Sequence, residues 1–467
     1  MTPLSERLVL GLAQRSSRGR RVSLRFEGSA MPAAQDIGSG SGDPDASIMV
    51  HDQRTWSALL QRGSRGLAES YIAGWWDTDD LTAVVRSALR CTVGLRQFLD
   101  KTARRSGGLV AAAQRLRPPS KHRDRENIAA HYDLSNEFFA LMLDPTMAYS
   151  CGYFADDSTS LEAAQVAKFE MIADKLQLGP RDHVIEIGTG WGGFAIHAAT
   201  RHGCRVTTTT ISEAQRALAE KRVAEHGLSD RVTVLGADYR DLEGRYDALV
   251  SIEMIEAVDW RRHDQFFATC AGLLTAEGRM VLQAITIEDV SYERAKLHDD
   301  FIRAMVFPGG CLPSVSSIAT SVARTSNLRI VDLQDIGIHY AETLRRWRAN
   351  LEDQRPAVER LGFDERFWRF WTLYLCYCEA AFMERHVSDV QLVLARPGAR
   401  SGRGGRSGQD PTKPSIASPR LRASRPLHAA PTRAACSLPV IPAPPTNTGR
   451  PGLTLSTART IALTERS

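Results

Sequence analysis

The chain has 467 residues, of which 43% are hydrophobic and 24% are charged. This length predicts two or three domains, and the apolar content suffices for a core that needs no disulfide or metal. The net charge of +5 arises at the C-terminal end, because residues 397–467 carry +9 and the rest of the chain carries −4. The overall basic charge therefore does not indicate a nucleic-acid-binding protein.

The eight cysteines are scattered, with no CxxC pair and no Cys/His cluster at zinc-ligand spacing. We therefore expect reduced thiols, a cytoplasmic protein and no metal. The apolar stretch at residues 8–12 is too short for a secretory signal, and no apolar run approaches the length of a membrane span. The sequence predicts that any contact with lipid occurs from the aqueous side.

Residues 1–119 are expected to form a small N-terminal domain. Its pattern is mixed up to a Gly/Ser-rich loop at residues 38–44, and from about Ser47 to Leu95 apolar residues recur at helical spacing. A basic connector with two adjacent prolines, residues 115–125, predicts the domain boundary.

Residues 120–396 alternate between strand and helix patterns. Strands are expected at 183–188, 205–210, 232–237, 246–252, 279–286, 328–332 and 390–395. Helices are expected at 194–201, 213–226, 341–351 and 365–384. This alternation predicts an α/β domain with an open, mainly parallel sheet and helices on both faces.

Residues 397–467 are rich in Pro, Arg, Ser, Ala and Thr and show little apolar periodicity. Such a composition buries too little apolar surface to offset the entropy lost on ordering. We expect a disordered tail.

The sharpest local motif is VIEIGTGWGG at residues 184–193, which follows a predicted strand and opens a helix. Its glycines permit a tight turn and the close approach of a ligand. Glu186 stands before the first glycine, where a carboxylate suits the cationic amino group of S-adenosylmethionine but not a pyrophosphate. A glycine motif of this kind is also typical of a plain strand–helix turn.

The next strand lacks the terminal acid that binds ribose in dinucleotide sites. It is followed instead by Thr210 and Gln215, which can hydrogen-bond a ribose or a methionine moiety. Their alternative roles are surface polarity and support of a helix capped by Ser212. A dinucleotide-dependent oxidoreductase is therefore the weaker interpretation.

Several segments closely resemble the cyclopropane fatty acid synthase family over residues 126–396. They are HYDLSNEFF at 131–139, YSCGYF at 149–154, the glycine loop, FPGGCLPS at 307–314 and YCEAAF at 377–382. A weaker resemblance at 61–77 covers the family's N-terminal, lipid-engaging domain. The resemblance implies a Rossmann-like class I methyltransferase fold, with a mainly parallel seven-stranded sheet, a smaller N-terminal domain and a disordered C-terminal tail.

The resemblance also implies an activity. A methyl group would pass from S-adenosylmethionine to the double bond of an unsaturated fatty acyl chain of a phospholipid, through a carbocation that loses a proton. An isolated alkene is a poor nucleophile, so alignment and exclusion of water must supply much of the rate. The partner would be phospholipid at the inner face of the cell membrane, contacted peripherally, and a homodimer is left open.

The family's cofactor contacts transfer onto a lid, the glycine loop and the positions beside the ribose and adenine. These are Tyr149, Ser150, Glu186, Gly188, Gly190, Trp191, Gly192, Thr210, Gln215, Tyr239 and Arg240. For each tyrosine alone, plain core packing is the alternative.

By the same resemblance, aromatic faces at Tyr132, Tyr340 and Phe382 would stabilise the carbocation. A bound bicarbonate would serve as base, held by Cys151, Glu256, Tyr340 and the backbone at Ile285. Cys378 would lie in the catalytic region. Alone, Glu256 would be typical of a solvated turn and Cys378 of a core residue.

Two departures from the family fall in the site of the base. Gln283 stands where the family has His, and Ala257 follows Glu256 where the family has a second His. Gln283 donates a hydrogen bond but carries no charge. These changes resemble an actinobacterial subgroup that makes 10-methylene or 10-methyl (tuberculostearic) chains, so we expect the branched product over cyclopropane. A methyltransferase of a soluble small molecule, and an inactive lipid- or cofactor-binding homologue, remain the alternatives.

Overall fold

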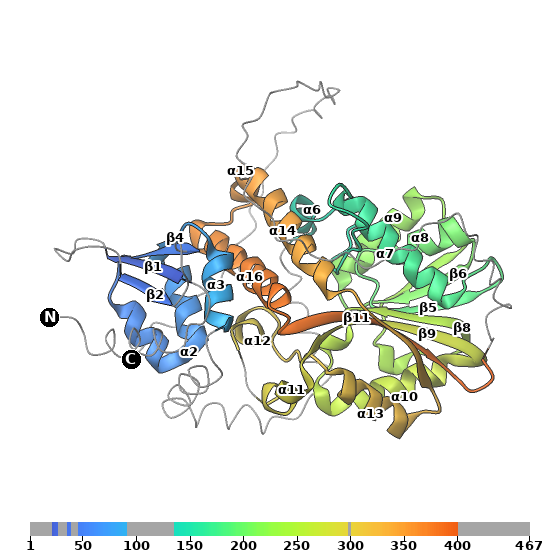
Figure 1. Cartoon of the computed structure of the whole chain (residues 1–467). Coiled ribbons are helices and arrows are strands. Elements are labelled where there is room, and N and C mark those ends of the chain that lie inside the picture. Colours follow the sequence, from blue (N-terminus) through green and yellow to red (C-terminus); the bar gives the residue numbers. More distant parts are fainter. Residues whose placement is uncertain (1–20, 27–34, 39–44, 91–134, 298–299, 400–467) are drawn as a thin grey trace, which may run out of the picture. The chain divides into compact units, whose positions relative to one another are not determined.

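The structure is a computed structural model, and it describes residues 21–26, 35–38, 45–90, 135–297 and 300–399 (Figure 1). Tyr132, the whole of the predicted domain boundary and the tail from residue 400 lie outside the described residues.

Among the described residues, the N-terminal part contains a four-stranded sheet in the order β2-β1-β3-β4 and the helices α2 and α3. The elements are β1 (Arg21–Phe26), β2 (Gln35–Gly38), β3 (Ala46–Val50), α2 (Arg54–Ile72), β4 (Trp76–Thr78) and α3 (Leu81–Arg90). The prediction of helix throughout residues 47–95 was wrong at β3 and β4. β3 pairs with both β1 and β4, so sheet hydrogen bonds override the helical spacing of its apolar residues.

The large sheet has seven strands in the order β10-β11-β9-β8-β5-β6-β7. The strands are β5 (His183–Ile187), β6 (Arg205–Thr209), β7 (Val232–Leu235), β8 (Tyr246–Ile252), β9 (Leu274–Ile287), β10 (Arg329–Asp335) and β11 (Val387–Ala395). The five strands from β9 to β7 are parallel, and β11 is antiparallel to both of its neighbours, β9 and β10. The predicted mainly parallel α/β sheet is confirmed, although β9 begins at Leu274 rather than at Arg279.

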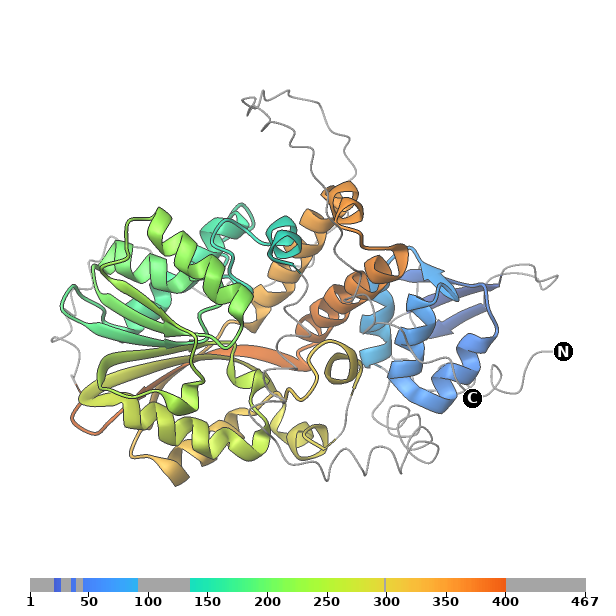
Figure 2. The same ribbon diagram turned by 180° about the vertical axis from the view of Figure 1, so that it is seen from behind.

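Helices cover both faces of this sheet (Figures 1 and 2). The α-helices described after residue 135 are α6 (Asn136–Met142), α7 (Leu161–Leu176), α8 (Gly193–His202), α9 (Glu213–Glu225), α10 (His263–Leu273), α11 (Asp289–Ala295), α12 (Phe301–Met305), α13 (Val315–Thr325), α14 (Gly337–Asp353), α15 (Arg355–Arg360) and α16 (Glu365–Met383). Because side chains alternate along a strand, Val184 of β5 packs into one core and Ile185 into the other. The near-continuous apolar strands follow from this two-sided burial.

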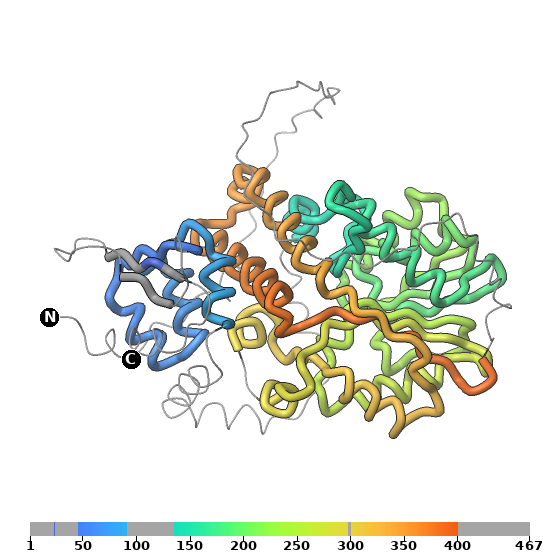
Figure 3. Tube along the Cα trace, viewed as in Figure 1, coloured from blue at the N-terminus to red at the C-terminus, as the bar shows by residue number. Residues whose placement is uncertain are grey.

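Helix α16 joins the N-terminal part to the large sheet, since it packs on α3 and leads directly into β11 (Figure 3). Its Arg369 donates to the backbone oxygens of Tyr71 and Trp76 and pairs with Asp77 at 2.6 Å. Tyr374 and Phe382 lie two turns apart on a face buried in the core. The helix therefore contacts the N-terminal elements on one side and the aromatic core on the other.

Candidate active site

A cavity of about 1230 Å³, counted with its open mouth, lies at the carboxyl ends of β5, β6 and β8. In parallel α/β sheets this is the edge at which ligands bind. Its lining includes every predicted cofactor position except Gly192: Tyr149, Ser150, Glu186, Gly188, Gly190, Trp191, Thr210, Gln215, Tyr239 and Arg240.

The glycine loop connects β5 to α8 and forms one wall of this cavity. Gly188 has φ of 105°, and a Cβ there would lie 3.1 Å from Cβ of Met254. Gly192, which caps α8, has φ of 86°. Glycine is required at both positions because L residues rarely adopt such φ values. The indole of Trp191 points away from solvent and donates to Asn136 at 2.7 Å, so this residue contributes through its position in the loop.

Glu186 is the last acid before the glycines and is buried on β5. Its Oε2 accepts a 2.6 Å hydrogen bond from the Thr208 hydroxyl on the neighbouring strand β6. Burial raises the pKa of Glu186 to about 8, against the opposing effect of Thr208. A cationic group in the cavity would restore the charge of this carboxyl group, which fits the predicted contact with an amino group.

The residues after β6 and β7 complete the cofactor side of the cavity. The Thr210 hydroxyl donates to Oε1 of Gln215 at 2.9 Å, while Ser212 caps α9. Arg240 pairs with Asp238 at 2.5 Å, beside the Tyr239 ring. Thr210 and Gln215 therefore hold each other in place at the wall, a contact that the capping alternative alone does not explain.

The lid residues are anchored from two helices. The Tyr149 and Tyr374 hydroxyls lie 2.8 Å apart, which links the cavity to α16. Lys168 on α7 is fully buried, and its Nζ donates to the Ser150 hydroxyl at 2.6 Å. Lys168 places a cation behind the cavity wall, close enough to lower the pKa of both Glu186 and Glu253.

Glu253 directly follows β8 and lines the same cavity. Its Oε1 accepts hydrogen bonds of 2.8 Å from the backbone N–H of Cys151 and from Nε2 of Gln283. Its Oε2 accepts one of 2.5 Å from the Tyr340 hydroxyl. Glu253 also has φ of 49°, a left-handed conformation that is costly for a residue with a Cβ and concentrates at functional sites.

Gln283 on β9 bridges two carboxyl groups, those of the cavity-lining Glu253 and the buried Asp389. Its Nε2 donates to Glu253 and also to Oδ2 of Asp389 on β11, at 2.9 Å. Its Oε1 accepts from Gln391 at 3.0 Å, and Gln391 in turn accepts from Lys175 at 2.7 Å. This chain fixes the amide so that its N–H groups face the carboxyl groups.

The surroundings of Glu253 and Asp389 determine which of these two carboxyl groups is ionised. Burial and the nearby charge of Glu253 raise the pKa of Asp389 well above its usual range. Burial also raises the pKa of Glu253, but Tyr340, Lys168, Cys151 and Gln283 all oppose this. Asp389 therefore holds the proton, and Glu253 is the better-stabilised carboxylate.

Glu256 lies on the short helix η2 (Ile255–Ala257) after the same strand. Its Oε1 accepts a 2.6 Å hydrogen bond from the backbone N–H of Ile285, and its buried Oε2 makes no hydrogen bond. Burial, with the charge of Glu253, raises its pKa to about 8. The Glu256 carboxyl group is thus shielded from water with one oxygen free of hydrogen bonds, which a solvated turn does not explain.

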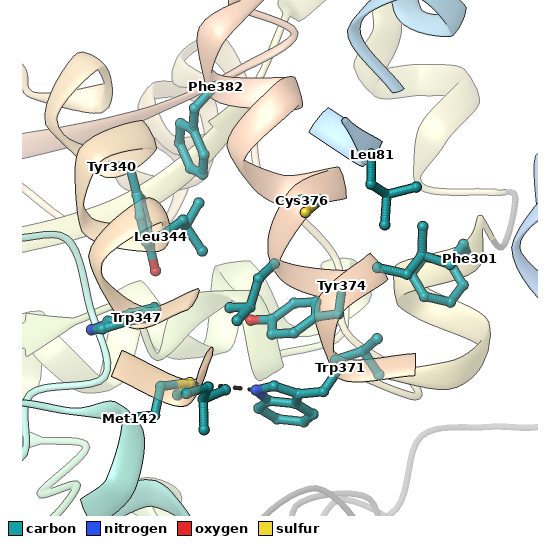
Figure 4. Packing of buried hydrophobic residues seen from close by; sticks show 14 of the residues in the cluster. Leu81, Met142, Phe301, Tyr340, Leu344, Trp347, Trp371, Tyr374, Cys376 and Phe382 are labelled. Atoms are coloured by element: carbon teal, nitrogen blue, oxygen red, sulfur yellow. Dashed lines mark hydrogen bonds between the residues drawn. The ribbon is translucent and has the colours of Figure 1, made fainter. Parts of the chain in front are cut away.

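Aromatic side chains of α14 and α16 face one another in the core (Figure 4). The rings of Tyr340 and Phe382 stack with centroids 4.4 Å apart, and Tyr340 contacts Trp347 edge to face. Cys378 lies one turn before Phe382 on α16, and burial raises its thiol pKa. Burial likewise raises the pKa of Cys151, so both sulfurs remain thiols, and Cys151 reaches Glu253 through its backbone.

Sequence reasoning did not assign roles to Glu253, Lys168 or Asp389. Glu253 directly follows a predicted strand, and Glu186 lies near the carboxyl end of another, so this position was a usable signal. Lys168 and Asp389 carried no such signal, because they reach the site from the middle of a helix and from an antiparallel strand.

The strand order, the single reversed strand β11 and the glycine loop after β5 define a Rossmann-like methyltransferase. The profile of the mycolic acid cyclopropane synthetase family matches residues 119–392. The chain belongs to this family.

Curated relatives agree with this assignment. Tuberculostearic acid methyltransferase UfaA1 of Mycobacterium tuberculosis is 40% identical over 374 residues, covering 77% of this chain and 86% of the relative. Cyclopropane-fatty-acyl-phospholipid synthase of Escherichia coli is 37% identical over 358 residues, covering 76% and 89%.

Solved structures match the methyltransferase domain. The cyclopropane synthase MmaA2 of Mycobacterium tuberculosis has a TM-score of 0.55 at 31% identity, over 58% of this chain and 98% of the other. The mycolic acid cyclopropane synthase CmaA1 complexed with SAH and CTAB has a TM-score of 0.54 at 31% identity, with the same coverage.

Proposed function

We propose that the protein transfers a methyl group from S-adenosylmethionine to the double bond of an unsaturated fatty acyl chain in a phospholipid, and that Glu253 takes the resulting proton. The names of the relatives support the reaction class, since both describe modification of fatty acyl chains. The observation that carries the second part is the Glu253 carboxylate, which accepts hydrogen bonds from Cys151, Gln283 and Tyr340.

The cavity fits the cofactor through its charges. Glu186 faces a site for a cationic amino group, and Thr210 with Gln215 offers partners for the ribose and methionine parts. Tyr239 would contact the adenine, and Tyr149 and Ser150 would cover the ligand. When bound, S-adenosylmethionine supplies a methyl group activated by a sulfonium.

The protein's own groups then control the carbocation. The electron pair of the alkene forms the new carbon–carbon bond as the sulfur–carbon bond breaks. The stacked rings of Tyr340 and Phe382 present faces that stabilise a cation without adding to it. Their burial keeps out water, which would trap the cation.

The proton leaves to Glu253. A hydride first shifts from the methylated carbon to the neighbouring cationic carbon, so that the cation moves to the carbon that carries the new methyl group. A C–H bond of this methyl group then breaks, its electrons form the methylene double bond, and the proton joins a carboxylate oxygen of Glu253. The groups expected to hold a bicarbonate base are divided between two acids: Cys151 and Tyr340 donate to Glu253, and Ile285 donates to Glu256. A side-chain carboxylate thus receives donors that the bicarbonate prediction required, and we infer that the enzyme needs no bicarbonate.

We further propose the branched product, with a methylene group, rather than a cyclopropane ring. Its support is the departure at Gln283, which here holds Glu253 in place, together with the first relative named above. Gas chromatography with mass spectrometry of lipids from a host expressing the protein should show a methylene-branched chain. A cyclopropane peak without the methylene-branched chain would refute this proposed product.

The test of the base uses purified enzyme in carbonate-free buffer with labelled S-adenosylmethionine and oleoyl phospholipid vesicles. The wild type should methylate lipid without added bicarbonate. Glu253→Gly should lose about 10²–10⁴-fold in rate and recover with bicarbonate, because a general base contributes about that much. The matched control, exposed Glu277→Gln, should behave as the wild type.

The outcomes separate the two parts of the proposal. Wild-type activity that requires bicarbonate would overturn the role of Glu253 alone. Labelled methyl on a soluble acceptor but never on vesicles, or on nothing, would overturn the lipid function.

None of the helices in the described ranges has the length and apolar character that crossing a membrane demands. We propose peripheral contact with the inner face of the cell membrane, and Val290 on α11, which is 91% exposed, is a candidate contact. Vesicle co-sedimentation should weaken in Val290→Asp. The homodimer stays a prediction.

A further inference from the structure

Three potential metal ligands meet between α7 and α8, outside the residues assigned above. Glu170 of α7 and His197 and His202 of α8 each offer one ligand atom, and these atoms lie within 4.8 Å of one another. Nε2 of His197 lies 2.9 Å from Oε2 of Glu170, and Nε2 of His202 lies 3.4 Å from the same oxygen.

Hydrogen bonds among Glu170, His197 and His202 satisfy only some of the polar atoms of these three side chains. His197 and Glu170 form a well-shaped hydrogen bond, but Nε2 of His202 is buried and makes none. A buried polar atom without a hydrogen bond is costly, so a further partner for His202 would stabilise the fold.

The two separations from the Glu170 oxygen suit a small divalent ion. Zinc binds imidazole nitrogen and carboxylate oxygen at about 2.0–2.2 Å, which places ligand atoms of a tetrahedron about 3.4 Å apart. The His202–Glu170 separation has this value, and the His197–Glu170 separation is within about half an ångström of it. The Glu170 side chain is 39% exposed, so water has access as a fourth ligand.

We propose that Glu170, His197 and His202 form a zinc site that joins α7 to α8. Two imidazoles with one carboxylate favour zinc over magnesium or calcium, which prefer oxygen ligands throughout. The sequence showed no zinc pattern because the ligands come from two helices.

The site would brace the elements that hold the cofactor cavity. Helix α7 carries Gln165 and Lys168, which bind the Ser150 backbone oxygen and hydroxyl. Helix α8 begins directly after the glycine loop. A metal between them would stabilise both walls without touching the reacting atoms.

Isothermal titration of metal-free, full-length protein with zinc chloride tests the proposal. We expect one zinc per chain, and binding at least about tenfold weaker in His202→Ala and in Glu170→Gln, since even the loss of an outer-shell partner costs that much. The control His226→Ala, on an exposed histidine after α9, should bind as the wild type. Magnesium chloride should give no saturable binding.

Thermal unfolding provides the second measurement. Zinc should raise the melting temperature of the wild type and of His226→Ala, but not of the two ligand variants. Circular dichroism confirms that each variant is folded, and Glu170→Gln keeps the helix intact if His202→Ala does not. The absence of saturable zinc binding, or equal binding in the folded ligand variants, would overturn the proposal.

Discussion

The Tyr340 hydroxyl donates a 2.5 Å hydrogen bond to Oε2 of Glu253, across 87 residues of sequence. This contact joins α14 to the end of β8, and the same tyrosine stacks on Phe382 of α16. One residue thus holds the carboxylate and forms part of the aromatic wall beside it, so the proposed base and the proposed cation site are positioned together.

Removal of that hydroxyl should weaken the base while preserving the ring. In Tyr340→Phe we expect kcat to fall about 10- to 100-fold, because hydrogen bonds to charged groups contribute about 1.5–3 kcal/mol. Tyr340 lowers the pKa of Glu253, so its loss should raise that pKa and move the acid limb of the pH–rate profile to higher pH. Steady-state kinetics across pH measure both effects.

The control is Tyr246→Phe, which removes a hydroxyl bonded to the Glu243 backbone at the opposite end of β8. It should leave kcat and the pH profile unchanged. Equal losses in the two variants would show that the Tyr340 effect is general destabilisation.

Gln283→His restores the residue type that the family resemblance led us to expect. An imidazole cannot provide the carbonyl oxygen that Gln391 uses, and it cannot repeat both donations from a single atom. We expect about 1–3 kcal/mol of lost stability from the unsatisfied Gln391, and a lower kcat. Urea unfolding and lipid methylation assays measure these changes.

Gln334→His, on the half-exposed edge strand β10, is the matched control and should change neither quantity by much. A Gln283→His enzyme with wild-type stability and rate would contradict the bridging role of the amide.

Cofactor binding should release a proton from Glu186. Its pKa of about 8 leaves it mostly protonated at neutral pH, and the cofactor's amino group would favour the ionised form. At about pH 7 we expect release of up to about 0.9 proton, falling towards zero above about pH 9. Titration calorimetry in buffers of different ionisation enthalpy measures this number.

Glu186→Gln should bind the cofactor more weakly and lose this proton release. The same carboxyl group links folding to pH: its raised pKa makes its contribution to stability largest below about pH 4.5, lost as pH rises through about 8. Unchanged proton release in the variant would assign the proton to another group.

Gly193 lies in a tightly packed site, whereas Gly272 has open space around it. A Cβ at Gly193, the first residue of α8, would lie 2.7 Å from the Thr146 backbone oxygen and 3.2 Å from the Phe169 ring. We expect Gly193→Ala to cost about 1–3 kcal/mol of folding free energy, since backbone must move. Gly272→Ala, in α10 with nothing within 4 Å, should instead stabilise by up to about 1 kcal/mol. Urea unfolding of the pair should give opposite signs.

The sequence alone determined the α/β class, most strands of the large sheet and the glycine loop with Glu186, because each depends on local periodicity or on residues adjacent in the chain. It did not determine the two short strands of the N-terminal sheet, whose hydrogen bonds come from distant partners.

Only the tertiary structure decided the site of the base. Glu253 is one acid among many in the sequence, and its donors stand 102, 30 and 87 residues away at Cys151, Gln283 and Tyr340. No local pattern encodes such distances. Burial then determines which of the Glu253 and Asp389 carboxyl groups is ionised, because in water the two groups would ionise independently.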